Sequence, residues 1–356
     1  MPDRPTLILD VMGAERGIAE MVHGVVEACK APFPSPTQLV LVTNEMEHTR
    51  QLVGQELAAV AAQHDCAVEL IPATQTLPEN FTSPVDVFKK HPQCSIRVAM
   101  DHAKQTPASA VVSLGTTGLV MTSALFTLGR VKGIARPPIG TPMPTRGKQL
   151  FFVDGGSNVD NRPEHLYQFA VLAHLYVKNV YKVPRPAIAL LSNGSEEYKG
   201  NAVVREAASL ISADQDLNFV GFTEGHTLFK GDLDIMVCDG FIGNILLKFA
   251  EGAADMIISF LKEEIKNSLL SRLAAKIFQR RALRQFAHRL DYTYFGGAPL
   301  LGLNGNVVIC HGRSPANAIK YALLVGHELA RSDIAKQVAQ YMEAHPLVVN
   351  GGNSGS

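Results

Sequence analysis

The chain has 356 residues, which is enough for one large α/β domain or about two smaller domains. Lys plus Arg and Asp plus Glu are equal at 33 each, so no overall charge would recruit nucleic acid or a strongly acidic partner. The five cysteines show no CxxC or Cys/His ligand spacing, which favours a reducing cytoplasm over a disulfide framework or a structural zinc site.

Export and membrane signals are weak in this sequence. Residues 1–10, MPDRPTLILD, lack the apolar region of a signal peptide, and no apolar run nears the ~18 residues of a membrane span. We therefore expect a cytoplasmic enzyme. Residues 346–356 are rich in Gly, Ser and Asn, and we expect them to form a disordered tail.

Short apolar runs recur along the chain, and most end in Gly, Asp, Asn or Ser, as buried strands do. They cover residues 6–10, 38–44, 67–73, 110–115, 150–156, 187–194, 217–222, 233–240 and 307–312. Stretches with helical periodicity separate most of these runs, for example residues 21–29, 119–129 and 164–181. The alternation predicts an α/β/α sandwich with a mostly parallel sheet, whose ligands bind beyond the carboxyl ends of the strands.

One long helical stretch, from Asn244 to Arg289, breaks this alternation. Its apolar residues keep to one helical face, which predicts a projecting hairpin or an oligomer-forming arm. We expect residues 1–345 to form a single α/β domain from which an amphipathic hairpin, residues 256–290, projects.

The first polar strand end in chain order is SLGTTG, directly before a helical pattern. Its glycines let the backbone approach a ligand, its threonine hydroxyls can donate hydrogen bonds, and the helix start attracts an anion. A plain tight turn is the alternative. The candidate anion-binding residues are Ser113, Gly115, Thr116, Thr117 and Gly118.

The second polar strand end is DGGSNVDNRPEHL, from Asp154 to Leu166. Asp154, Asn158 and Asp160 crowd a glycine-rich exit, and this indicates a binding site in addition to a turn. An Asx-turn with a helix cap is the alternative, and His165, in the first helical turn, is either a site residue or part of that cap.

The third and fourth strand ends contain Lys199 and Asn244. Lys199 precedes a helix, where the dipole disfavours a cation unless an anion shares the site, although a solvated loop lysine is the alternative. Asn244 ends CDGFIGN and can offer the amide N–H that an acyl-transfer oxyanion requires. Cys238 in this motif is interpreted as a buried small residue and not as a nucleophile, because no cation adjoins it in sequence.

These four strand ends are expected to converge at one crevice if the sheet is parallel. Amide donors, hydroxyls, one lysine and a few carboxylates suit chemistry on an anion better than covalent or metal chemistry. The sequence also lacks a Gly-x-Ser-x-Gly elbow, an HExxH motif and a Walker lysine. His311, at the end of another predicted strand, is a candidate for the wall of the site.

The same motifs carry a resemblance to the phosphate acyltransferase family (PlsX type), which forms acyl phosphate from acyl-acyl carrier protein and inorganic phosphate. The resemblance runs from Leu7 to about Leu329 and rests on six specific sequence motifs: DGGSNVDNRPEHL, GRVKGIARP, KGN, DGFIGN, FGGAPLLG and HGRSPANAIK. It implies an α/β/α sandwich similar to isocitrate and isopropylmalate dehydrogenases and to phosphotransacetylase, assembled as a homodimer.

The resemblance also implies roles for single residues. Lys199 of KGN and Asn244 of DGFIGN become the catalytic pair, with phosphate as the nucleophile and no metal or other cofactor required. The expected substrate-binding positions also include Gly200, Asn201, Asp239, Gly243 and Gly297 within these motifs, and Asn193 at the end of the apolar run before KGN.

Three loops depart from the family pattern. Residues 10–18 read DVMGAERGI and lack the usual Asp-His pair, the usual Gly-Asn-Thr-Gly loop is GTTG, and the usual Asp-Val-Gly-Ala-Asn is DGGSN. These departures leave the acceptor and the acyl chain open. The alternatives are a paralogue that uses another acceptor or acyl-coenzyme A, and a weakly catalytic membrane-associated scaffold.

The predicted hairpin is basic and amphipathic, since every charged residue between Lys266 and Arg289 is a cation. Three interpretations remain: a solvated face over a dimer core, contact with an anionic membrane surface, and docking of the acidic carrier protein. The residues expected to make membrane or carrier-protein contact are Leu269, Leu273, Ile277, Arg280, Arg281 and Arg284.

Overall fold

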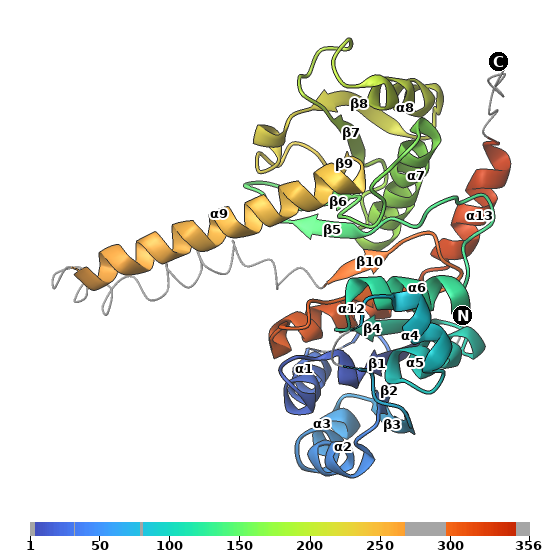
Figure 1. The fold of residues 1–356 in the computed structure, drawn as a ribbon, viewed down its shortest axis with the longest axis vertical. Coiled ribbons are helices and arrows are strands. Elements are labelled where there is room, and N and C mark those ends of the chain that lie inside the picture. Colours follow the sequence, from blue (N-terminus) through green and yellow to red (C-terminus); the bar gives the residue numbers. More distant parts are fainter. Residues whose placement is uncertain (1–3, 32, 79–80, 268–296, 347–356) are drawn as a thin grey trace.

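The computed structural model describes residues 4–31, 33–78, 81–267 and 297–346. It contains two β-sheets, shown one above the other in Figure 1. The first sheet has the order β10-β11-β4-β1-β2-β3, and the second has the order β5-β6-β9-β7-β8. The predicted α/β class with mostly parallel strands is confirmed, although the strands form two sheets where one was expected.

The first sheet is parallel except for β10, which pairs antiparallel with β11. Its strands are β1 (Thr6–Asp10), β2 (Thr37–Thr43), β3 (Cys66–Pro72), β4 (Ser109–Ser113), β10 (Ala298–Leu300) and β11 (Asn306–Ile309). Its helices are α1 (Ile18–Lys30), α2 (Met46–Leu52), α3 (Ala58–Gln63), α4 (Pro84–Lys90), α5 (Ser95–Gln105), α6 (Thr117–Thr127) and α12 (Ala316–Arg331).

Alternating side chains of β1 explain why helices cover both faces of this sheet. Leu7 and Leu9 point into a core shared with α1 and α12, whereas Ile8 points into a separate core shared with α5 and α6. Since successive residues of a strand face opposite sides, an unbroken apolar run such as TLIL needs a helix layer on each side.

The second sheet is parallel except for β5, which pairs antiparallel with β6. Its strands are β5 (Gly140–Met143), β6 (Leu150–Val153), β7 (Ala187–Leu191), β8 (Asn218–Thr223) and β9 (Ile235–Val237). The other α-helices of the described residues are α7 (Pro163–Val180), α8 (Ala202–Ala213), α9 (Gly240–Asn267) and α13 (Ile334–Ala344). One face of this sheet packs on α7 and α8, and the other packs against Leu246, Leu247 and Ala250 of α9.

The two sheets approach each other through their antiparallel edge strands. Ile139, just before β5, forms an isolated antiparallel bridge with Leu300 of β10. The core that contains α1, α12, α7 and α8 also runs continuously past both sheets. Neither β5 nor β10 is among the strands predicted from apolar runs.

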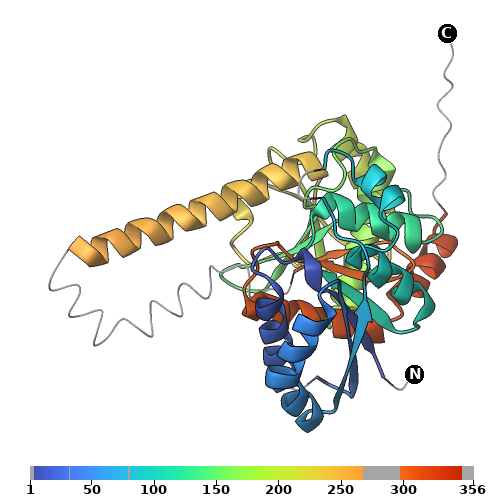
Figure 2. The same ribbon diagram turned by 60° about the horizontal axis from the view of Figure 1, so that its bottom comes forward.

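Helix α9 projects away from both sheets, as Figures 1 and 2 show. It begins at Gly240, earlier than the predicted helical stretch from Asn244. Among the described residues, no helix has the length and apolar character needed to cross a membrane. The predicted hairpin beyond Asn267, with its six contact residues, and residues 347–356 of the predicted tail lie outside the described residues.

Candidate active site

Three of the four polar strand ends lie side by side at the carboxyl edge of the second sheet. Strand β9 pairs with both β6 and β7 in parallel, so the segments that follow these strands leave the same edge. Asp154 follows β6, Asp239 follows β9, and Lys199 is in the loop after β7. The fourth strand end, Ser113–Gly118, follows β4 in the first sheet, so the four do not leave a single sheet.

The Asp154 carboxylate organises the turn that follows β6. It is completely buried and accepts hydrogen bonds at 2.8–3.1 Å. The donors are the backbone N–H groups of Ile139, Gly156, Ser157 and Asn158, the Ser157 hydroxyl and the Asn158 side-chain amide. The Asn158 amide also donates to the Pro137 carbonyl at 3.0 Å. The side chains of Asp154 and Asn158 therefore make their hydrogen bonds within this turn and its neighbours, as expected from the Asx-turn alternative.

The first turn of α9 packs directly on this Asp154 turn. The Gly240 N–H donates to the Asn158 carbonyl at 2.8 Å, and a Cβ on Gly243 would lie 1.9 Å from the Asp154 carbonyl oxygen. Asp239 caps the helix, because its carboxylate accepts from the Ile242 N–H at 2.9 Å. The sequence DGFIGN therefore builds a helix start that fits closely against the neighbouring loop.

This fit places the Asn244 side chain beside the backbone of Gly156. A Cβ on Gly156 would lie 3.0 Å from the Asn244 Cβ, and Gly156 has a φ of +128°, a conformation that favours glycine. The half-buried Asn244 amide makes no hydrogen bond with the described residues. Its N–H donors are therefore available to a ligand.

The loop after β7 is held by asparagine side chains on both sides of Lys199. The side-chain Oδ1 of Asn193 accepts from the Gly200 N–H at 2.9 Å. Asn201 caps α8, because its Oδ1 accepts from the Val204 N–H at 2.9 Å. Lys199 itself is half-buried, and its ammonium lies 5.4 Å from the centre of the Tyr198 ring. In the described part of the chain, this ammonium makes no ion pair and no hydrogen bond.

Two predicted site residues after Asn158, one before α7 and one in its first turn, have simpler positions. His165 is buried, and its Nδ1 accepts from the Arg162 N–H at 3.2 Å, completing the cap of α7. Burial lowers the pKa of His165, and the nearby Arg136 and Arg162 lower it further. Asp160 is exposed. The cap is therefore sufficient to account for His165.

The Ser113–Gly118 loop forms a separate polar group on the first sheet. The buried Ser113 hydroxyl donates to Asp10 Oδ2 at 2.7 Å and accepts from the Gly115 N–H at 3.1 Å. Burial raises the pKa of Asp10, while hydrogen bonds from Ser95 and Ser113 lower it. Thr116, Thr117 and Gly118 are exposed at the start of α6.

The two remaining candidates also belong to the first sheet. His311 is exposed after β11, and its Nδ1 accepts from the Arg313 N–H at 3.2 Å. Partial burial raises the pKa of Glu251 on α9, and the nearby His311 opposes this effect, so α9 passes close to the end of β11. Gly297 directly precedes β10.

Sequence reasoning missed three residues that shape these loops: Gly156, Ser157 and Asp10. Gly156 and Ser157 lie inside the DGGSN motif, and Asp10 ends the first apolar run, so their positions at strand ends were a usable signal. Cys238 is confirmed as buried, and burial raises its pKa well above the usual value. A buried thiol whose pKa is raised is disfavoured as a thiolate nucleophile.

The arrangement offers an anion a half-buried cation and offers a carbonyl oxygen an amide donor. Comparison with known proteins identifies the family of the chain. A family model described as "Fatty acid synthesis protein" matches residues 6–337. A protein of Geotalea uraniireducens named phosphate acyltransferase is 40% identical over 344 residues, covering 95% of each chain. The chain belongs to the phosphate acyltransferase family.

Other members of the phosphate acyltransferase family match over a similar length. The phosphate acyltransferase of Pelotomaculum thermopropionicum is 38% identical over 347 residues, covering 98% of each chain. The predicted family resemblance is thereby confirmed, and the chain is an enzyme of the acyltransferase class.

Solved structures support the fold of this phosphate acyltransferase family member. A phosphotransacetylase from Streptococcus pyogenes matches with a TM-score of 0.60 and 16% identity, covering 93% of this chain and 95% of that one. The EutD phosphotransacetylase from Staphylococcus aureus matches with a TM-score of 0.54 and 15% identity, covering 92% and 94%. At such identities the likeness concerns the fold alone.

Proposed function

We propose that this enzyme transfers a fatty acyl group from acyl-acyl carrier protein to inorganic phosphate, giving acyl phosphate for phospholipid synthesis. One observation carries the proposal: Lys199 and Asn244 follow neighbouring parallel strands, and their polar ends have no partner among the described residues. A half-buried lysine without a counter-charge is stabilised when an anion binds beside it. Phosphate is such an anion, and the names of the relatives agree with it.

The proposed reaction is a direct displacement at the thioester carbonyl. Lys199 holds phosphate and offsets its charge while a phosphate oxygen attacks the carbonyl carbon. The Asn244 amide donates to the carbonyl oxygen as it becomes an oxyanion. The C–O bond forms, the C–S bond breaks, and the sulfur leaves as a thiolate that takes a proton from solvent.

Substitutions that preserve size test the two roles. Lys199→Met keeps most of the side-chain stem and removes the charge, and Asn244→Asp keeps the shape and removes the N–H donor. Losing one oxyanion donor typically lowers turnover by about 10²–10³-fold, so we expect each variant to lose acyl phosphate formation to this extent. The measurement is mass spectrometry of acyl phosphate made by purified protein.

An exposed lysine of the same half of the molecule serves as the control. Lys230→Met, in a loop before β9, should leave the rate unchanged. Near-normal rates in Lys199→Met or Asn244→Asp would contradict the assignment of that residue.

The acyl donor is tested by a panel of acyl carriers in the same assay. Acyl-acyl carrier protein is the proposed donor, and a clear preference for acyl-coenzyme A or for an acceptor other than phosphate would favour a specialised paralogue. Absence of turnover with every donor would favour a weakly catalytic scaffold.

We further propose that the enzyme is a cytoplasmic homodimer that associates peripherally with anionic membranes. Helix α9 supports an additional contact, because it exposes a row of large apolar side chains along its length. They are Phe241, Ile242, Ile245, Phe249, Met256, Ile257 and Phe260. Charge reversal at Arg280, Arg281 and Arg284 is expected to weaken vesicle co-sedimentation; unaffected co-sedimentation would contradict membrane contact.

A further inference from the structure

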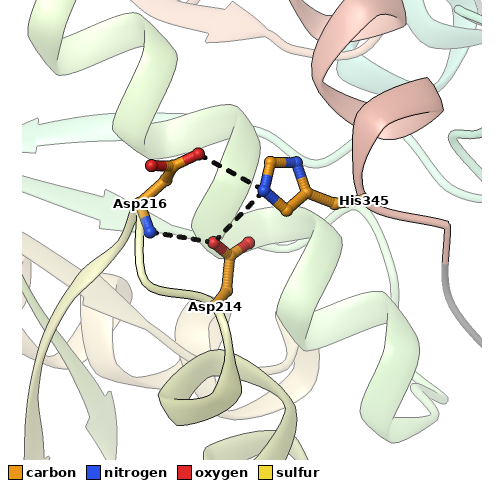
Figure 3. A group of neighbouring side chains, drawn as sticks. All are labelled: Asp214, Asp216 and His345. Atoms are coloured by element: carbon orange, nitrogen blue, oxygen red, sulfur yellow. Dashed lines mark hydrogen bonds and ion pairs between the residues drawn. The ribbon is translucent and has the colours of Figure 1, made fainter.

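A second polar cluster lies at the opposite edge of the second sheet from Lys199. Asp214 and Asp216 are in the turn between α8 and β8, and His345 ends α13 (Figure 3). Strand β8 runs parallel to β7, so the turn before β8 is at the amino edge, whereas Lys199 follows β7 at the carboxyl edge. The cluster is therefore separate from the candidate active site.

The three side chains point toward one another with the spacing of metal ligands. The His345 Nε2 atom lies 3.3 Å from Asp216 Oδ2 and 3.8 Å from Asp214 Oδ1, and the three ligand atoms all lie within 4.8 Å of one another. Around a tetrahedral ion with bonds of ~2.0–2.2 Å, ligand atoms are separated by about 3.4 Å. The two distances from His345 Nε2 bracket this value.

Contacts from outside the cluster orient two of the three ligands. The His345 Nδ1 atom is 3.1 Å from the Tyr341 carbonyl, and since a carbonyl can only accept, Nδ1 carries the proton. The other ring nitrogen, Nε2, therefore faces the two carboxylate oxygens. Metal-binding histidines typically donate their other N–H in this way.

Asp214 is held by two tyrosine hydroxyls. Its Oδ2 atom accepts from Tyr167 at 2.7 Å and from Tyr341 at 2.8 Å, which leaves Oδ1 on the side of the His345 ring. The side chain is only 4% exposed. Because the hydrogen bonds to Oδ2 hold this buried carboxylate in one orientation, Oδ1 is a preorganised ligand atom.

A second imidazole, that of His174, lies near the cluster, as does the Lys178 ammonium. In the described part of the chain, the ion pairs of Asp214 and Asp216 are both with His345. His174, seven residues after Tyr167 on α7, is buried, and its Nδ1 atom has no hydrogen-bond partner. Burial lowers the pKa of His174 and the nearby Lys178 lowers it further, while the nearby Asp214 and Asp216 oppose this effect. The two carboxylates thus lie close to a second imidazole whose nitrogen is unpartnered.

We propose that Asp214, Asp216 and His345 bind one divalent transition-metal ion of the Mn²⁺ or Zn²⁺ type, with water as the remaining ligands. Imidazole and carboxylate together suit these ions better than Mg²⁺ or Ca²⁺, which prefer oxygen ligands alone. Side chains of Asp216 and His345 are 66% and 31% exposed, so the ion can enter from solvent. The ion joins α13 to the turn between α8 and β8, away from the acyl-transfer chemistry.

The test is Mn²⁺ binding to the full chain after treatment with a chelator. Calorimetric titration at neutral pH should show one ion per chain, and saturating Mn²⁺ should raise the melting temperature by about 2–5 °C. Asp216→Asn and His345→Gln should each weaken binding by at least about 10-fold. Asp333→Asn, an exposed carboxylate at the other end of α13, is the matched control and should bind as the parent does.

Two results would overturn the proposal. One is the absence of saturable binding by either Mn²⁺ or Zn²⁺, which would mean that the cluster is only an ion pair with a protonated His345. The other is binding that both ligand variants retain. Acyl phosphate formation should be the same in Asp216→Asn and the parent. A failure of the metal-binding proposal would therefore leave the roles proposed for Lys199 and Asn244 untouched.

Discussion

Polar residues of the candidate site divide into two groups according to their hydrogen bonds. Asp154, Asn158 and Asp239 are satisfied by the turn and the helix start that they organise. Lys199 and Asn244 have polar ends without partners among the described residues. Sequence patterns predicted that all five residues lie at strand ends. They could not tell which of these side chains are already hydrogen-bonded, because one donor to Asp154, the Ile139 N–H, comes from a distant part of the sequence.

Gly156 offers a test of how closely Asn244 is positioned. In Gly156→Ala, the new Cβ would lie 3.0 Å from the Asn244 Cβ, in a backbone conformation that L side chains rarely adopt. We expect the Asn244 amide to be displaced and turnover of acyl phosphate formation to fall by about 10–100-fold, since misplacement by ~1 Å can cost 10²-fold.

The control for this substitution is in the same helix as Asn244. A Cβ on Gly252 of α9 would meet nothing within 4 Å, so Gly252→Ala should leave the rate unchanged. Equal rates for Gly156→Ala and the parent would show that the contact between these loops does not position the amide.

At the scale of elements, the central strands could be predicted and the edge strands could not. Buried parallel strands are continuous apolar runs, and each predicted run overlaps a strand of the structure. Strands β5 and β10 read GTPM and APL, which are too short and too rich in proline to show a pattern. Because these two strands mark where the sheets meet, the division into two sheets could not be predicted either.

Helix α9 allows a prediction about membrane contact from its described part. Met256 and Phe260 are 51% and 60% exposed on the projecting portion of the helix. Burying two such side chains at a membrane surface gains about 1.5–3 kcal/mol each. The double variant Met256→Glu, Phe260→Glu should therefore reduce co-sedimentation with anionic vesicles at least about 10-fold.

Val220→Glu, on β8 and outside α9, introduces charge at a residue of similar exposure and should leave vesicle binding unchanged. If the double variant sediments with vesicles as well as the parent does, the described part of α9 makes no membrane contact. A change in oligomeric state instead, measured by light scattering, would assign this apolar row to a homodimer.

At the scale of the whole molecule, two half-structures contribute different chemistry. The second sheet provides Lys199 and Asn244, while the first provides Asp10 and the Ser113–Gly118 loop. They share one continuous apolar core, and α9 brings Glu251 near His311 at the end of β11. The resemblance of the motifs identified the family, but only the structure shows that these motifs are divided between two sheets.

The shared core also contains titratable groups that make stability depend on pH. His327 is completely buried on α12, and burial lowers its pKa from 6.5; Glu328 opposes this effect and Arg331 reinforces it. Burial likewise lowers the pKa of His165 and His174. The unfolded chain therefore binds protons more readily than the folded one. The contribution of the neutral rings is fully present above about pH 6.5 and is lost as the pH falls toward the folded pKa values.

Each such histidine removes up to about 1.4 kcal/mol of stability per pH unit within that window. We expect the free energy of unfolding, measured with urea, to be lower at pH 5.5 than at pH 7.5, and this difference to be smaller in His327→Gln. Burial raises the pKa of Asp10, so Asp10 contributes the opposite pH dependence. Both the parent and His327→Gln contain Asp10, so comparing them cancels this contribution. The control is His48→Gln, at an exposed histidine, which should keep the pH dependence of the parent. If the free energy of unfolding changes with pH as much in His327→Gln as in the parent, protonation of His327 does not oppose folding.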